Sequence, residues 1–385
     1  MGFKRYLIFI VLIFLTGCKD RTAPASENEA SDNEYSRRFI IEKFEAYSKL
    51  TVKDPWQGAV NRDFIYYISN DISKIPPGVD RSKIILRPVK NIVCTSTTHI
   101  SMIDTLGGLE LISGVSGSDF VYNRKIRKRI NDEAVYDIGY ENGYNTELIY
   151  SISPDLVLVY GVGSESASSF RRLMNMGIPV LYIADYLEQH PLARAEWIKV
   201  YGELLGRQEQ AVKIFSSVRD KYEEVKQISS GQPGSDNRVM LGLPFKDKWF
   251  VSPGNSYISK LIEDAGGTYL WASTESDVSI PMSLEAVCQK ALDADIWLNT
   301  GIALSVDDIR AVDARLAGLP VISEGLVYNN NKRLNSYGGN DYWESGTVNP
   351  HILLKDIASI INPDLFPEHE LVYYKKILSS ADTLK

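Results

Sequence analysis

Aromatic, amide and hydroxyl side chains gather in several stretches of this 385-residue chain. Each stretch follows or contains a segment with the pattern of a β-strand, and ligands of open α/β sheets bind outside the carboxyl ends of strands. Aromatic faces beside amide groups suit a large, ring-rich ligand, and an arginine among them can neutralise an anionic one. The predicted ligand-binding residues are Thr97, Thr98, Tyr140, Tyr144, Trp249, Asn330, Arg333, Tyr342 and Trp343.

Patterns typical of catalysis are missing from the sequence. It contains no HExxH or CxxC spacing, no GxSxG elbow and no P-loop. The glycines Gly161 and Gly163 follow a predicted strand and open a helix, so their amides can bind an anion, although turn geometry alone also explains them. We therefore predict that the protein is not an enzyme and has neither catalytic residues nor a cofactor.

The four histidines, His99, His190, His351 and His369, are scattered along the chain. A dedicated transition-metal site needs three or four neighbouring ligands, and no two histidines here share the spacing of one helical face. The positions of His99, just after a predicted strand, and of His351, at a helix start, are explained by capping or surface roles. We predict no metal site.

The N-terminus has the pattern of a signal peptide. Lys4 and Arg5 precede an apolar run over residues 6–15, which is too short to span a membrane but has the length of a signal-peptide core. The stretch Leu15-Thr16-Gly17-Cys18 resembles the bacterial lipobox, which implies cleavage before Cys18 and lipidation of its thiol. A secreted protein with a chance cysteine is the alternative. We expect a signal peptide over 1–17, a flexible tether over 18–35, and a body held by lipid at the periplasmic face of a membrane.

Two further cysteines, Cys94 and Cys288, lie far apart in a predicted strand and a predicted helix. An oxidising compartment would allow a disulfide, but no framework of spaced cysteines surrounds them. We predict two buried free thiols.

The charge balance excludes one class of partner. The chain carries a net charge of −7, and removal of residues 1–17, with Lys4 and Arg5, takes it to −9. Binding to nucleic acid needs a basic face, which this sequence lacks.

The order of the predicted elements gives the fold class. Residues 36–88 are predicted to form an N-terminal extension packed on the first lobe, with a helix over 36–50 and a strand over 64–71. Strands and helices then alternate over 89–186 (lobe one), a long helical stretch divided by Gly206 covers 187–228, and alternation resumes over 236–385 (lobe two). This pattern predicts an α/β protein of two Rossmann-like lobes with central parallel sheets, joined by a long interlobe helix.

A loose repeat links the two lobes. "NTELIYSISPDLVLVYG" at 145–161 predicts a helix that opens with Thr146 and Glu147, a stop at Pro154 and a buried strand. "MSLEAVCQKALDADIWLNTG" at 282–301 repeats this unit, with Glu285 in the place of Glu147. The helix dipole favours an acid at such a position by ~0.3–1 kcal/mol, which explains one glutamate without any function.

The whole order resembles the class III substrate-binding proteins of bacterial ABC importers, in their lipoprotein form. That family captures ferric siderophores, haem and cobalamin. The resemblance rests on the segments "NIVCTSTTHISMIDTLGGLELISGVSG", "TELIYSISPDLVLVYG", "GIPVLYI", "YGELLGRQEQA", "LIEDAGG", "SLEAVCQKALDADIWLN" and "LLKDIASIINPDLFPE".

The resemblance implies a monomer that holds a metal chelate between its lobes with little hinge motion. It also implies that Glu147 and Glu285 dock onto arginines of a dimeric ABC permease, one carboxylate from each lobe. The chain departs from the family in "ALDADIW", which lacks the usual Pro-Asp, in the extension 36–88, and in the amide-rich loop 327–346. Because of that loop, the choice among siderophore, haem and cobalamin does not carry over.

Three alternatives stay open. A free metal-ion binder is disfavoured by the scattered histidines. A metallochelatase-like enzyme would need His99 to face Glu141 or Glu344 across the cleft, and a lipid anchor outside the cytoplasm argues against it. An adhesion lipoprotein would leave the ordered motifs unexplained.

Overall fold

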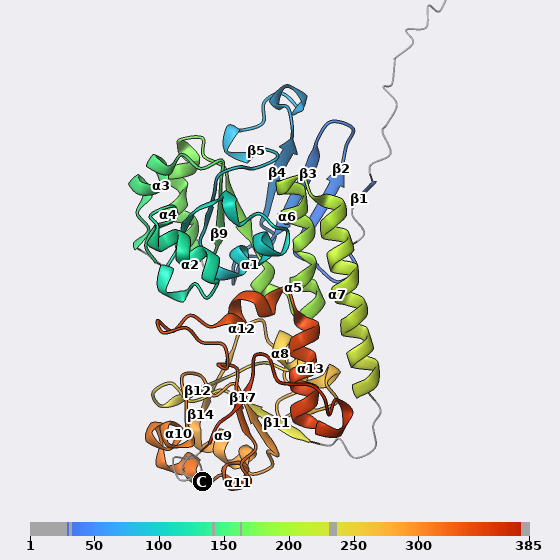
Figure 1. Ribbon diagram of the computed structural model, residues 1–385, viewed down its shortest axis with the longest axis vertical. Coiled ribbons are helices and arrows are strands. Elements are labelled where there is room, and N and C mark those ends of the chain that lie inside the picture. The colour runs from blue at the N-terminus through green and yellow to red at the C-terminus, as the bar shows by residue number, and fades with distance from the viewer. Residues whose placement is uncertain (1–28, 31–32, 141–142, 162–163, 231–236, 379–385) are drawn as a thin grey trace, which may run out of the picture.

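The computed structural model describes residues 29–30, 33–140, 143–161, 164–230 and 237–378. Two α/β lobes lie one above the other, with helices along one side of both and a small sheet beside the upper lobe (Figure 1). Cys18, Glu141 and most of the predicted tether lie outside the described residues.

Lobe one is built on a five-stranded parallel sheet in the order β10-β9-β6-β7-β8. Its central strand residues are buried on both faces, as their apolar, β-branched sequence predicts. The elements are β6 Ile92–Cys94, α1 Thr97–Thr105, β7 Ile112–Val115, α2 Arg124–Asn131, β8 Tyr136–Asp137, α3 Thr146–Ile152, β9 Leu156–Tyr160, α4 Ser164–Asn175 and β10 Val180–Ile183.

Lobe two has a sheet in the order β13-β11-β15-β16-β17, in which only β17 runs antiparallel, and a separate antiparallel ribbon of β12 and β14. Its strands are β11 Arg238–Leu241, β12 Lys248–Val251, β13 Thr268–Tyr269, β14 Ile280–Ser283, β15 Ile296–Leu298, β16 Val327–Asn329 and β17 Lys375–Lys376. Its helices are α8 Tyr257–Asp264, α9 Leu284–Ala291, α10 Val306–Val312, α11 Pro320–Ser323, α12 Asp341–Glu344 and α13 Pro350–Ile361.

Three helices link the lobes: α5 Pro191–Glu196, α6 Ile198–Leu205 and α7 Gln208–Ser229. Gly206, with φ of +67°, ends α6 in the left-handed conformation that glycine adopts without strain. The 22 residues of α7 span about 33 Å, and the helix packs on α6 and on α13 of lobe two. The predicted two-lobed α/β fold with a long interlobe helix is confirmed (Figure 1).

The extension corrects one prediction. Residues 36–50 form no helix; they enter an antiparallel sheet of β1 Glu29–Ala30, β2 Phe39–Lys43, β3 Ser48–Lys53 and β4 Asp63–Ser69, which β5 Ile84–Leu86 joins in parallel. Burial alternates along β2, with Phe39 and Ile41 inward, and the stacked rings of Phe44 and Tyr47 close the turn at 4.6 Å. The apolar residues of this stretch recur with the period of two that is typical of a strand, and not with the helical period that was predicted.

The predicted tether is too long at its carboxyl end. The backbone N–H groups of Glu34, Tyr35 and Ser36 donate to the buried carboxylate of Glu196 on α5, at 2.7–2.9 Å. Lys199 pairs with the same carboxylate at 2.6 Å. Residues 33–36 are therefore part of the folded body.

Both thiols of the described residues are free, as predicted; Cys94 is buried and Cys288 half-buried. None of the helices in the described residues combines the length and the apolar character that crossing a membrane requires.

Candidate ligand-binding cleft

A cavity of about 710 Å³ lies where β11, β15 and β16 of lobe two end. We call it the lobe-two cavity. Its position agrees with the rule that ligands bind at the carboxyl ends of parallel strands. Its lining combines amides, aromatic rings and aliphatic side chains, namely Arg194, Leu241, Gly242, Ser252, Ser256, Tyr257, Ile258, Asn299, Gly301, Ile302, Leu304, Asn330, Asn331, Leu334, Gly338, Asn340, Tyr342 and Trp343.

Three of the predicted ligand-binding residues meet in this cavity. Tyr342 is buried, and its phenol interacts with the side chains of Asn299 and Asn330. Burial raises the pKa of Tyr342, so the phenol keeps its proton. Trp343 is 55% exposed and packs edge-on against Tyr342 at 4.7 Å between ring centroids. The cavity therefore offers a buried, hydrogen-bonded phenol next to an exposed indole ring.

Arg194 of α5 is a cavity residue that the sequence did not reveal. Its guanidinium lies 3.9 Å from the ring centroid of Tyr257 and donates to the carbonyl oxygens of Tyr186 and Glu188 at 2.9 and 3.3 Å. Among the described residues, no carboxylate lies within ion-pair distance of it. Arg194 stands in a predicted helix far from any strand end, so no local pattern marks it.

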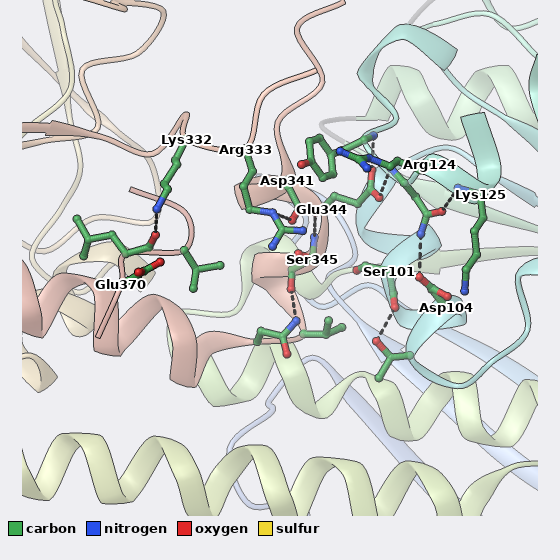
Figure 2. A pocket seen from close by; sticks show the side chains of 17 residues that line it. Ser101, Asp104, Arg124, Lys125, Lys332, Arg333, Asp341, Glu344, Ser345 and Glu370 are labelled. Atoms are coloured by element: carbon green, nitrogen blue, oxygen red, sulfur yellow. Dashed lines mark hydrogen bonds and ion pairs between the residues drawn. The ribbon is translucent and has the colours of Figure 1, made fainter. Parts of the chain in front are cut away.

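A second, larger cavity of about 1020 Å³ lies between the lobes, and we call it the charged cavity. Figure 2 shows Asp104, Arg124 and Lys125 entering it from lobe one and Lys332, Arg333, Asp341, Glu344 and Glu370 from lobe two. The predicted ligand residue Arg333 lines this cavity and not the lobe-two cavity. It pairs with the buried Asp341 at 2.7 Å, so its charge is already balanced.

Glu344 joins the lobes across the charged cavity. Its buried carboxylate accepts the backbone N–H groups of Tyr122 and Asn123, at the start of α2, at 2.8 and 2.9 Å. Burial raises the pKa of Glu344 to about 8, although these two hydrogen bonds act against the shift. Close by, the amide of Asn335 donates to the carbonyl oxygen of Val121 at 2.9 Å. These contacts hold the stretch 335–344 of lobe two against residues 121–123 of lobe one.

Trp249 does not reach either cavity, contrary to prediction. Burial alternates along β12, which turns Trp249 inward, fully buried, and leaves Phe250 half exposed. The indole N–H donates to the carbonyl oxygen of Leu241 at 3.0 Å, and the ring lies 5.9 Å from that of Trp297. Trp249 is a core residue of lobe two.

The lobe-one candidates lie outside both cavities. Tyr144 packs against Phe170, with 4.9 Å between ring centroids, and Tyr140 is 52% exposed with its ring 5.1 Å from Phe120. Thr97 and Thr98 begin α1 and are half-buried. The predicted contacts therefore divide: three candidates of lobe two, Asn330, Tyr342 and Trp343, meet in one cavity, and those of lobe one do not.

The histidines give no sign of a reactive site. His99 is fully buried, neither ring nitrogen has a hydrogen-bond partner, and burial lowers its pKa to about 3. It therefore cannot face Glu344 across an open cleft, as a chelatase would require. Across the described residues, no group of three or more histidine, cysteine or acidic side chains is placed to hold a metal ion.

The two glutamates of the repeat occupy equivalent positions. Each is the second residue of its helix, Glu147 in α3 and Glu285 in α9, and is exposed. The N-cap side chains of Asn145 and Ser283 fix these helix starts by accepting N–H groups of the first turn. Glu285 also pairs with Arg315.

Comparison with known proteins identifies the family. Residues 92–332 match the model of the family described as periplasmic binding protein. The chain belongs to this family. It is a class III substrate-binding protein of ABC importers, and such proteins bind solutes for transport. The extension and the end of lobe two fall outside the matched range.

The most informative relatives are distant. An uncharacterized lipoprotein of Methanocaldococcus jannaschii is 22% identical over 306 residues, covering 77% of this chain and 71% of the relative. A periplasmic solute-binding protein of Veillonella parvula has a TM-score of 0.57 at 20% identity, covering 78% and 87% of the two chains. A vitamin B12 binding protein of Vibrio cholerae has a TM-score of 0.51 at 16% identity, covering 73% and 99%. The solved structures support the shared fold.

Proposed function

We propose that this substrate-binding protein captures a metal chelate, namely a ferric siderophore, haem or cobalamin, and delivers it to an ABC permease. The observation that carries the proposal is the lobe-two cavity, where an exposed indole, a buried phenol network and an arginine converge at the strand ends. Ring-rich ligands bury aromatic surface well, and a few fixed polar groups orient them. Solved relatives include an Fe3+-hydroxamate transport component of Saccharomonospora viridis and the vitamin B12 binding protein of Vibrio cholerae.

Delivery would use one carboxylate from each lobe. Glu147 and Glu285 are both exposed at the second position of a capped helix, so each can meet an arginine of a dimeric permease. Lipidation of Cys18 would hold the protein at the periplasmic face of a membrane, in keeping with the lipoprotein relative.

Tryptophan fluorescence tests the ligand directly. The chain lacking residues 1–17 is titrated with haemin, cyanocobalamin, ferrichrome and ferric enterobactin, with Fe3+ and Zn2+ as controls. We expect submicromolar quenching by one chelate and none by the free ions, since Trp343 lines the cavity and is 55% exposed. A response to a free ion alone would overturn the proposal and favour a metal-ion binder.

A further inference from the structure

The loop between β3 and β4, residues 54–62, forms one wall of a third cavity. This cavity, the extension cavity, has a volume of about 360 Å³ and is also lined by residues of lobe two, namely Ser252, Pro253, Asn255, Ser256, Tyr257 and 276–279. The loop belongs to the extension, which precedes the family match at 92–332. A segment outside the family core therefore faces the space between the lobes.

The loop is held in place by its own contacts. Asp54 and Arg62 exchange two hydrogen bonds of 2.9 Å that close its base. Trp56 is buried, and its ring lies 5.5 Å from both Phe64 and Tyr182, which ties the loop to strand β10 of lobe one. The tip, by contrast, leaves Val60 72% exposed. The base of the loop is therefore fixed to lobe one, while its tip stays exposed and can line a cavity.

The extension cavity adjoins the lobe-two cavity. Arg194, Ser252, Ser256 and Tyr257 line both. The two cavities therefore adjoin at these four residues, and a ligand seated at the strand ends of lobe two lies next to the extension cavity.

Arg194 lies where the two cavities adjoin, and within the described residues no carboxylate forms an ion pair with it. Stacking on Tyr257 and the bonds to two backbone carbonyls fix the guanidinium without neutralising it. The buried carboxyl of Asp185 forms no ion pair with it within 4 Å in the described residues, but the two groups interact electrostatically. Burial raises the pKa of Asp185, and the charge of Arg194 acts against that shift. A fixed, unpaired arginine between two cavities is suited to a carboxylate or phosphate.

We propose that the ligand site extends into the extension cavity, with an anionic arm of the chelate bound at Arg194 and lying along the loop at Val60. This inference rests on the proposed function and gives the substrate class within it: a chelate that carries a carboxylate or phosphate on a side arm. It also gives the extension a role, as the wall that selects for such an arm.

Two substitutions of opposite charge at position 60 test whether the loop of the extension lies beside an anionic arm of the ligand. Val60 is exposed, so Val60→Lys and Val60→Glu should both fold. The probes are haemin, with its propionates, and cyanocobalamin, with its phosphate, compared with the neutral ferrichrome and with dicyanocobinamide, which lacks the phosphate arm. Ile72, a half-exposed residue of the extension that lines none of the three cavities, gives the matched controls Ile72→Lys and Ile72→Glu.

The expected result is a tighter Kd for the arm-bearing chelate with Val60→Lys and a weaker one with Val60→Glu. Each change should be about threefold to tenfold at low salt and smaller at high salt. Arg194→Gln should weaken the same chelate, while Arg194→Lys should retain part of the affinity. Equal, small effects at positions 60 and 72, or preference for a chelate without an anionic arm, would overturn the inference and leave the binding function intact. Failure of the unchanged protein to bind any chelate would instead overturn the proposed function.

Discussion

In lobe one, Glu147 stands exposed at the second residue of α3, with no ion pair within 4 Å in the described part of the chain. In lobe two, Glu285 holds the same place in α9 but pairs with Arg315, which Asp313 also binds at 2.8 Å. The lobes also differ in their ligand candidates, because Asn330, Tyr342 and Trp343 of lobe two meet in a cavity and no candidates of lobe one do. The two glutamates thus share a position but not their surroundings, and we propose that both dock while ligand recognition lies mainly in lobe two.

Reversing both docking charges should produce the largest effect. We expect Glu147→Arg combined with Glu285→Arg to reduce transport at least about a hundredfold, because two attractive contacts with permease arginines become repulsive. Ligand affinity should not change, since neither glutamate lines a cavity. Uptake of the labelled chelate and fluorescence titration measure the two properties separately.

Each of the two reversals is also made alone, and the control for each is Glu209→Arg, which changes the net charge by the same amount. Glu209 is likewise an exposed acid in the first turn of a helix, α7, but lies outside the repeated unit. Loss of uptake with this control as well would mean that net charge matters and not the two positions.

Truncating one aromatic residue from each lobe tests where recognition lies. We expect Trp343→Ala to weaken binding of the chelate about tenfold or more, because it removes the exposed indole of the lobe-two cavity. Tyr140→Ala in lobe one should change Kd by less than about threefold, because Tyr140 lines none of the cavities. Isothermal titration of both variants gives the comparison, and the reverse order would transfer recognition to lobe one.

The burial of the Glu344 carboxyl should make stability depend on pH. The folded state raises the pKa of Glu344 from 4.5 to about 8, so between these values the folded protein binds more protons than the unfolded chain. This contribution to stability is complete below about pH 4.5 and is lost as pH rises to about 8, by at most about 5 kcal/mol for the full shift.

Glu344→Gln isolates that contribution, since glutamine resembles the protonated acid and does not titrate. Urea unfolding from pH 5 to pH 8 should show the unchanged protein losing stability relative to the variant. A constant difference between the two across this range would contradict the prediction.

The smallest effect should come from removing the ion pair between Glu285 and Arg315. Arg315→Ala removes the exposed partner of Glu285; if Glu285 docks as we propose, affinity for the permease should rise about two- to threefold. Arg310→Ala is the matched control, because Arg310 is similarly exposed and pairs with Asp307 instead. Binding of the protein to permease in nanodiscs measures the change.

The sequence predicted the fold well where its periodicity was strong. The buried β-branched runs of lobe one and the long amphipathic pattern of the linking helices gave the right elements, because burial on both faces or on one helical face leaves a clear pattern. The stretch 36–50 was predicted to be a helix but holds β2 and the start of β3, because strands as short as Phe39–Lys43 give too few residues to separate a period of two from a helical one.

The cavity was harder to predict than the fold. Asn330, Tyr342 and Trp343 were found because they follow strand β16, but Trp249 was misplaced, since strand alternation alone decides which neighbour turns inward. Arg194 was missed because its role comes from a contact with Tyr257, more than sixty residues along the chain. Such a pairing depends on tertiary packing and leaves no local signal.

The hydrogen bonds from residues 34–36 to Glu196 also set where the body would hang from a membrane. They fasten the chain to α5, one of the helices that link the lobes, just after β1, which pairs with β2 of the extension. A lipid at Cys18 would therefore load the extension and the linking helices first, and not α3 or α9, the helices that carry Glu147 and Glu285.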